Sequence, residues 1–320
     1  MLQILLVTFP FFALVLAGFV AAWRRLLPLE AIPGLNGFVL FFALPCMLYR
    51  FGSTTPIAQL LDLTVAGIYL LCALAMVAFA VVMTLNSRIR WNDASLGALV
   101  AAFPNSGFMG VPLLVALLGA SAEGPVILTM LVDMVITSSL CVALSRLDEG
   151  EGHGRAAMLD AGKKALRGVA ANPMPWSILL GALASHLQFT LPAPVEKTAW
   201  LLADAASPVA LFTIGAVLAR SQIQASHPMP VSDYLPPALM KLVLHPLLVL
   251  AVGASATQLG LPLDPQALVV MVLVAALPSA SNVSLLAERL GADNGRIARI
   301  ILVTTAASFL TFSAAVSLLA

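Results

Sequence analysis

The residues best suited to chemistry in this sequence interrupt an apolar stretch near its middle. Residues 96–118 carry no charge and are about long enough to cross the hydrocarbon core of a bilayer. Two prolines stand in this stretch together with small and polar residues: Pro104, Asn105, Ser106, Gly107, Gly110 and Pro112. An asparagine side chain both donates and accepts hydrogen bonds, and glycine lets a solute approach the backbone closely. These residue types predict a site for a polar solute inside an apolar segment.

Each of the two prolines removes a helical hydrogen bond. Pro104 has no N–H and its ring crowds the carbonyl of Val100, and Pro112 does the same to Phe108. Each also disfavours helical geometry at the residue before it. In lipid, a freed carbonyl is costly unless protein or a water-filled cavity satisfies it. We therefore predict a helix that is broken inside the membrane; a merely kinked helix is the alternative.

A second interruption of the same kind occurs later in the chain. Residues 99–106, Leu-Val-Ala-Ala-Phe-Pro-Asn-Ser, align with residues 273–280, Leu-Val-Ala-Ala-Leu-Pro-Ser-Ala. The residues that mark this second break are Pro278, Ser279, Ser281 and Asn282. A duplicated, interrupted apolar segment is typical of secondary transporters, in which the ligand lies near the midplane between the two breaks.

The helices that restart after each break favour an anionic ligand. Their first N–H groups and the positive ends of their dipoles are expected to point toward the site, which suits a carboxylate. An alternative is that the polar side chains only cap their own broken helices, and the two roles can coexist.

One acidic residue lies deep in another apolar stretch. Asp133 stands one turn from both Thr129 and Thr137, so the three share a helix face. An acid inside a membrane span is a functional-site hypothesis by default. Asp133 can carry a coupling proton or help to hold a sodium ion; alternatively, it is the structural partner of a buried base. After a two-residue slip, beyond which residues 118–120 align with residues 290–292, Asp133 corresponds to Thr305; next to it, Thr304, Ser308 and Thr311 form a second hydroxyl stripe.

A possible base is present in the eighth apolar stretch. Lys241 and His245 are one turn apart near its predicted cytoplasmic half. Lys241 can snorkel to the membrane surface. Alternatively, it faces the interior and either pairs with Asp133 or attracts an anionic substrate.

The sequence does not suggest an enzyme. It contains no His/Glu metal-ligand spacing, no nucleophile–base pairing and no phosphate loop, and its three cysteines lie within apolar stretches. We expect no metal site and no cofactor other than a coupling sodium ion or proton. Nothing in the sequence suggests binding to nucleic acid.

Composition defines the class of protein. Of 320 residues, 61% are hydrophobic and 10% are charged, against roughly a quarter charged in a soluble domain. The fold class is therefore an all-α integral membrane protein within a lipid bilayer. We predict a first five-helix repeat at 1–147, a cytoplasmic linker at 148–172 and a second five-helix repeat at 173–320. The ten spans lie near 2–23, 34–50, 63–85, 94–118, 124–147, 173–191, 199–219, 236–259, 266–286 and 296–319.

Charge predicts the orientation of these spans. Among the Lys and Arg residues between spans, only Arg50 and Lys197 fall on one side, which is therefore the outside. Both termini are then outside, and because five is odd, the two repeats have inverted topology. The linker contains Arg155, Lys163, Lys164 and Arg167 among apolar residues, which fits either an amphipathic helix on the anionic membrane surface or a solvated connector.

Residues 104–112, Pro-Asn-Ser-Gly-Phe-Met-Gly-Val-Pro, resemble the hallmark of the auxin efflux carrier family, which includes bacterial malonate transporter-like permeases. The resemblance implies the fold of bile acid–sodium symporters and sodium–proton antiporters. In that fold helices 1, 2, 6 and 7 form a support domain that also makes a homodimer. Helices 3–5 and 8–10 form a transport domain in which the broken helices 4 and 9 cross, and Asn105 and Asn282 would flank the crossover. The short central linker departs from plant members, so control by loop phosphorylation is not expected.

These observations lead to one expected function and two alternatives. We expect a secondary transporter that moves a small organic anion, a carboxylate such as malonate, across a bacterial inner membrane by alternating access, with both termini periplasmic. The first alternative is a sodium- or proton-coupled symporter of another organic solute that uses Asp133 as coupling residue. The second, from another class, is a membrane-embedded enzyme or a receptor module.

Overall fold

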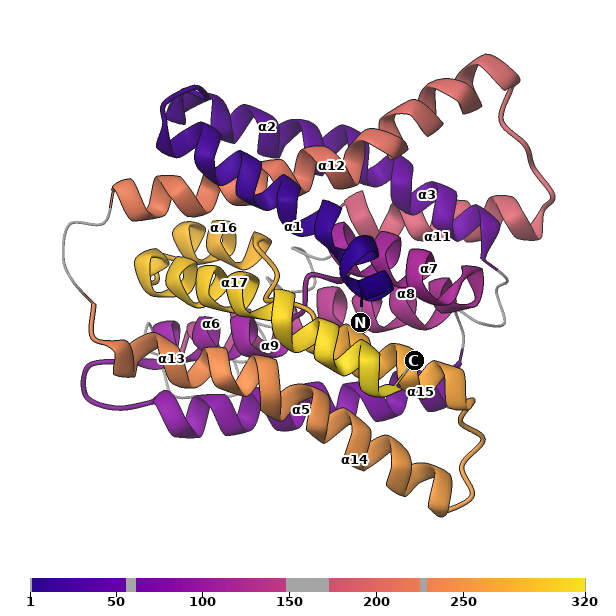
Figure 1. Ribbon diagram of the computed structural model, residues 1–320. Coiled ribbons are helices and arrows are strands. Elements are labelled where there is room, and N and C mark those ends of the chain that lie inside the picture. Colours follow the sequence, from indigo (N-terminus) through magenta and orange to yellow (C-terminus); the bar gives the residue numbers. More distant parts are fainter. Residues whose placement is uncertain (1, 56–61, 148–172, 225–228, 320) are drawn as a thin grey trace. The chain divides into compact units, whose positions relative to one another are not determined.

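The computed structural model describes residues 2–55, 62–147, 173–224 and 229–319, and in these ranges every regular element is a helix (Figure 1). The predicted linker helix at 148–172 lies outside the described residues. Short segments join several α-helices: the 3-10 turns η1 (Leu29–Ala31) and η4 (Ala120–Ala122), and the π-helical segments η2 (Val39–Ala43), η3 (Ser106–Gly110), η5 (Asp133–Thr137) and η6 (Met240–Leu244). The α-helices are α1 (Leu2–Trp23), α2 (Ile32–Phe38), α3 (Leu44–Thr54), α5 (Leu63–Thr84), α6 (Trp91–Ala102), α7 (Val111–Leu118), α8 (Glu123–Val132), α9 (Ser138–Ser145), α11 (Pro173–His186), α12 (Ala193–Ile223), α13 (Val231–Leu239), α14 (His245–Gln258), α15 (Pro265–Ala276), α16 (Asn282–Arg289) and α17 (Asn294–Leu319).

Seven helical stretches in the described ranges are long and apolar enough to cross a membrane, which agrees with an integral membrane protein. Of the other three predicted spans, two contain the expected breaks and so form shorter helices. The third corresponds to α11, which has 14 residues. The total of ten spans and their inverted pairing remain predictions. The seven stretches are Ile4–Trp23, Leu29–Thr54, Leu63–Thr84, Ala120–Ser145, Ala193–Ile223, Val231–Gln258 and Asn294–Leu319.

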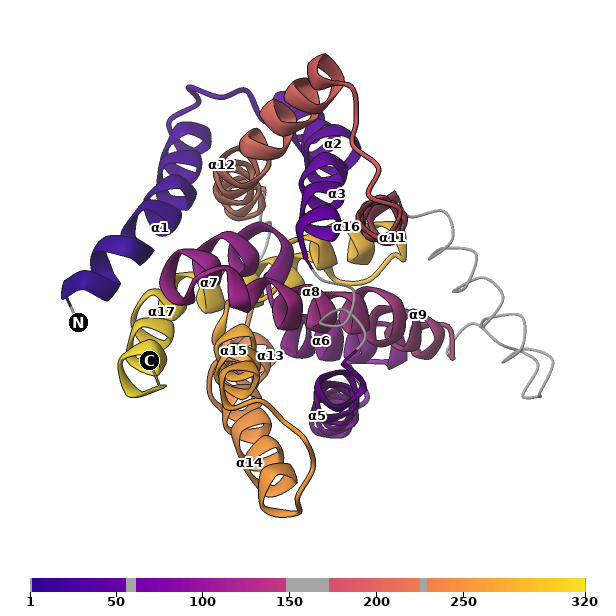
Figure 2. The ribbon, with the colours of Figure 1, turned by 90° about the vertical axis from the view of Figure 1, so that its right-hand side faces the viewer.

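The chain divides into two compact units, and the first comprises Met1–Asp62, Gly107–Leu128 and Asn172–Ala225. Within this unit, α1 packs along α12 (Figures 1 and 2). A Cβ added to Gly18 would overlap the carbonyl oxygen of Phe212, and one added to Gly215 would overlap that of Val15. Glycine on both helices therefore brings the two backbones into contact, the usual means of tight helix packing in membranes.

Glycine residues also bring α3 and α11 into close contact; these two helices lie side by side in both views (Figures 1 and 2). A Cβ on Gly52 would overlap the backbone of Ile178, and a Cβ on Gly181 would overlap that of Tyr49. Side chains other than glycine would force each pair of helices apart.

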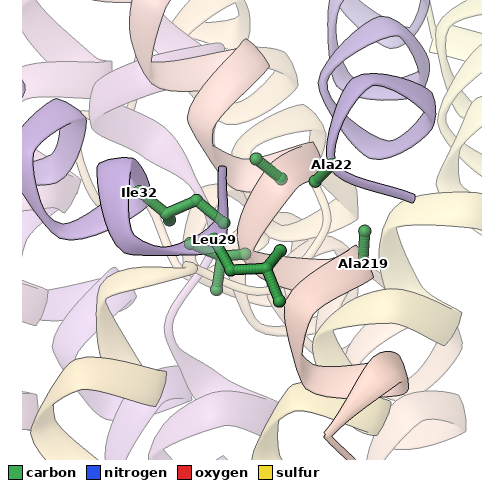
Figure 3. Close-up of a cluster of buried hydrophobic side chains, with 6 residues drawn as sticks. Ala22, Leu29, Ile32 and Ala219 are labelled. Atoms are coloured by element: carbon green, nitrogen blue, oxygen red, sulfur yellow. The ribbon is translucent and has the colours of Figure 1, made fainter. Parts of the chain in front are cut away.

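A buried apolar cluster closes the turn between α1 and α2 against α12 (Figure 3). Ala22 at the end of α1 and Ile32 at the start of α2 are both fully buried. Small residues on α12 let the turn approach closely. The cluster comprises Ala22, Leu29, Ile32, Ala216, Val217 and Ala219.

The second unit comprises Leu63–Ser106, Thr129–Ala171 and Ser226–Ala320. Here α5 packs on α6 and α14, α14 packs on α15, and α13 packs on α17. One buried cation joins the first turns of three of its helices: Arg296, 2% exposed, donates from Nη1 to the Asp93 carbonyl at 2.9 Å and from Nε to the Asp233 carbonyl at 2.7 Å. Asp93, Asp233 and Arg296 belong to α6, α13 and α17, so this residue fixes the helices that carry the site described below.

Candidate functional site

Both predicted helix breaks are present. The helix α6 ends at Ala102, and α15 ends at Ala276, each two residues before its proline. Phe103 (φ −93°, ψ 106°) and Leu277 (φ −62°, ψ 157°) adopt extended angles. Since proline disfavours helical geometry at the preceding residue, each break begins where the sequence predicts it.

The two breaks lie against each other and pair through their backbones. The Asn105 N–H donates to the Pro278 carbonyl at 2.8 Å, and the Ala280 N–H donates to the Phe103 carbonyl at 2.9 Å. These bonds form one antiparallel bridge between Pro104 and Ser279. Each break thus forms hydrogen bonds with backbone groups that the other break leaves without helical partners.

Serine hydroxyls satisfy the carbonyls that the prolines of the first break release. The Ser279 hydroxyl donates to the Val100 carbonyl at 2.7 Å, which is the oxygen that Pro104 leaves without a helical N–H. In the first unit, the Ser207 hydroxyl donates in the same way to the Phe108 carbonyl at 3.0 Å, which Pro112 frees. Protein groups therefore replace the missing helical donors, as a break inside an apolar environment requires.

Several polar side chains at the paired breaks keep unused hydrogen-bonding capacity. Asn105 is 5% exposed, and among the hydrogen bonds of the described residues its side chain takes no part. The Oδ1 atom of Asn282 is buried without a protein partner. Ser281 precedes α16 but makes no side-chain cap bond. The capping-only interpretation therefore does not account for Asn282 or Ser281.

The remaining residues of the first break divide between the two units. Ser106, fully buried in the second unit, makes a long local contact of 3.4 Å with the Pro104 carbonyl. Gly107, Gly110 and Pro112 belong to the first unit. There, Gly110 directly precedes α7, and Pro112 is its second residue.

Asp133 is fully buried in the second unit and accepts two hydroxyl hydrogen bonds. The Thr137 hydroxyl donates to Oδ1 at 3.0 Å, and the Tyr69 hydroxyl on α5 donates to Oδ2 at 2.8 Å. Asp133 is the first residue of the π-helical segment η5. Such π-helical distortions are frequent at functional sites. Thr129 is also fully buried. Tyr69 was not among the predicted site residues, although a tyrosine hydroxyl inside a membrane span needs a hydrogen-bond partner and so indicates a polar neighbour.

Lys241 is also fully buried, so the snorkelling interpretation is wrong. Its ammonium donates to the Ala275 carbonyl at 2.5 Å and lies 3.3 Å from Nδ1 of His245. In the described ranges Lys241 forms no ion pair with Asp133. The two clusters approach each other through Tyr69, whose ring centroid is 6.1 Å from that of His245. Lys241 lies in the π-helical segment η6.

The second hydroxyl stripe joins the site at one position. The Thr304 hydroxyl accepts a hydrogen bond from the Ser279 N–H at 3.3 Å and donates to the Ile301 carbonyl at 3.0 Å. Ser308 instead bonds to the Thr305 carbonyl within α17. Both Thr305 and Ser308 are buried, but of this stripe it is Thr304 that bonds to a residue of a break.

These features define a multi-pass membrane protein with paired helix breaks and buried ionisable side chains. A family model described as "Membrane transport protein" matches residues 4–316. The chain belongs to this family, which confirms the resemblance to the auxin efflux carriers.

Named relatives agree with this assignment. The chain is 31% identical over 308 residues to the "Putative malonate transporter" of Rhizobium meliloti (strain 1021), covering 94% of this chain and 91% of that protein. It is 28% identical over 198 residues to the "Uncharacterized transporter YfdV" of Escherichia coli (strain K12), covering 62% of this chain and 59% of that protein. The family and these relatives are transporters, so the protein is a membrane transporter and not an enzyme.

Proposed function

We propose that this protein is a secondary transporter of a small organic anion, a carboxylate or dicarboxylate such as malonate. The observation that carries the proposal is the pairing of the two breaks, beside which the side chains of Asn105 and Asn282 retain free hydrogen-bonding groups. The oxygen and nitrogen of an asparagine amide can exchange places by a flip, so both side chains can donate to a carboxylate. The name of the Rhizobium relative supports the carboxylate class.

The proposed architecture is a ten-helix inverted repeat in which the fourth and ninth spans are broken and cross. The antiparallel bridge between Pro104 and Ser279 supports this arrangement, because inverted repeats bring equivalent segments together in opposite directions. We assign helices 1, 2, 6 and 7 to a support domain that forms a homodimer, and helices 3–5 and 8–10 to a transport domain. Transport then proceeds by alternating access in a bacterial inner membrane, with both termini periplasmic.

Uptake by purified protein in liposomes tests the substrate class. Radiolabelled malonate and a panel of other carboxylates are expected to accumulate in proteoliposomes and not in empty liposomes. Asn105→Ala and Asn282→Ala are expected to weaken substrate-induced thermal stabilisation more than they lower the melting temperature of the free protein. Asn36→Ala, in α2 of the other unit, is the matched control. Absence of uptake across the panel contradicts the proposal, and unchanged affinity in both variants contradicts the assigned site.

A second candidate is sodium- or proton-coupled symport of another organic solute through Asp133. Full burial of this carboxylate, with hydroxyl partners and no ion-pair partner in the described ranges, favours it. Dependence of uptake on an imposed ion gradient distinguishes this candidate from uncoupled anion transport.

A further inference from the structure

The carbonyl end of the broken helix α15 has an unusual hydrogen-bond donor. The last four carbonyls of an α-helix lack helical N–H partners and form the negative end of its dipole. Near the end of α15, the Val274 carbonyl accepts the Leu277 N–H at 3.1 Å. The Ala275 carbonyl instead accepts the ammonium group of Lys241, which comes from η6.

A buried ammonium group needs negative potential around it, and this position supplies it from two sources. Lys241 is fully buried, and its removal from water is costly unless the charge is compensated. One source is the carbonyl end of α15. The other is the carboxylate of Asp133, whose hydrogen-bond partner Tyr69 lies next to His245, the neighbour of Lys241. Nδ1 of His245 serves as an acceptor, because an ammonium group can only donate.

The first break is capped without a charge. There, the released Val100 carbonyl receives a neutral hydroxyl from Ser279. The ionisable amine of Lys241 thus donates to a carbonyl at the end of α15, whereas a neutral hydroxyl, that of Ser279, donates near the end of α6. In general, carbonyls freed at unwound or broken membrane helices, together with a nearby carboxylate, form the kind of oxygen-lined site that a sodium ion occupies.

We propose that Lys241 is a built-in cation that occupies this position, so that the transporter works without a bound sodium ion. The ammonium group neutralises the carbonyl end of α15 and positions the second break, while Asp133 provides the compensating negative charge. This inference rests on the proposed transport function for its uptake test and is independent of that function for its stability test. Lys241 is accordingly a positioning residue and does not itself contact the solute.

The stability test uses the full chain purified in detergent. The melting temperature of the wild-type protein is expected to be the same in sodium chloride and in choline chloride of equal concentration. Lys241→Gln, which keeps a donor but removes the charge, is expected to melt several degrees lower, and Lys241→Arg is expected to recover part of the loss. Lys197→Met removes an exposed lysine of α12 and is the matched control.

The uptake test uses radiolabelled malonate in proteoliposomes. Wild-type uptake is expected to be equal with a sodium gradient and with choline, and Lys241→Gln is expected to lower it by about tenfold or more, the loss of one charge-assisted hydrogen bond. Wild-type protein that requires sodium for uptake, or that sodium stabilises saturably, overturns the proposal. So does a Lys241→Gln variant with wild-type melting temperature. If no malonate uptake occurs in any medium, the proposed substrate fails while the melting temperatures still decide the role of Lys241.

Discussion

Asn105 in the first helix break and Pro278 in the second share a backbone hydrogen bond of 2.8 Å, from the Asn105 N–H to the Pro278 carbonyl. Neither residue can make its usual helical bond, because the chain leaves helical geometry at both positions. The bond therefore holds the two helix breaks together as one paired segment. This pairing explains how a polar site can persist in a protein that is 61% hydrophobic.

Ser279 is expected to stabilise the paired breaks through its hydroxyl. Ser279→Ala leaves the Val100 carbonyl buried without a donor, which is expected to lower the free energy of unfolding by about 1–3 kcal/mol. Thermal unfolding in detergent measures the change. Ser255→Ala is the control, because the Ser255 hydroxyl bonds only to a carbonyl of its own exposed helix turn. Equal melting temperatures for the two variants would show that another group serves the Val100 carbonyl.

Tyr69 is expected to hold the carboxylate of Asp133. Tyr69→Phe removes one of its two hydroxyl donors and is expected to destabilise the protein by about 1–3 kcal/mol, because the acceptor is fully buried. The ring and its contact with His245 are retained, so the change reports on the hydroxyl alone. Tyr49→Phe provides the comparison at a partly exposed tyrosine. A Tyr69→Phe protein as stable as Tyr49→Phe would contradict this role.

Replacement of Asp133 tests whether this residue couples transport to protons. Asp133→Asn retains the shape and an oxygen acceptor but cannot exchange a proton. If Asp133 is the coupling residue, uptake driven by a proton gradient is expected to be lost to a much greater extent than exchange of labelled for unlabelled substrate. Rates of both processes in the same proteoliposomes provide the measurement. A variant that still responds to the proton gradient excludes the coupling role.

Gly97 is expected to be intolerant of even a methyl group. A Cβ at this position would lie 2.8 Å from Nη1 of Arg296, which is buried and held by the Asp93 carbonyl. Gly97→Ala is therefore expected to destabilise the protein by about 1–3 kcal/mol, because the guanidinium group must leave its acceptors. The control, Gly67→Ala on α5, meets no atom within 4 Å and is expected to be stabilising by up to about 1 kcal/mol. Melting temperatures that move in the same direction would contradict the packing argument.

The amino-acid sequence by itself determines the class of the protein and the positions of its breaks. Composition requires a lipid environment, and Pro104 and Pro278 end their helices through covalent geometry that acts within one turn. The duplicated segment is visible around the same two prolines, and the family match covers residues 4–316. Local chemistry suffices for all of these features, so sequence patterns predict them.

Only the tertiary structure decided which partner each released or buried group finds. The Val100 carbonyl accepts a hydrogen bond from Ser279, the Asp133 carboxylate from Tyr69, and the Ala275 carbonyl from Lys241. In each case the donor comes from a distant segment of the chain. Local spacing can show that a carbonyl or carboxylate needs a donor, but it does not specify which of several distant donors will reach it. The packing of α5, η6, α15 and the paired breaks makes that choice, because a hydrogen bond forms only when the approach of two helices brings donor and acceptor within about 3 Å.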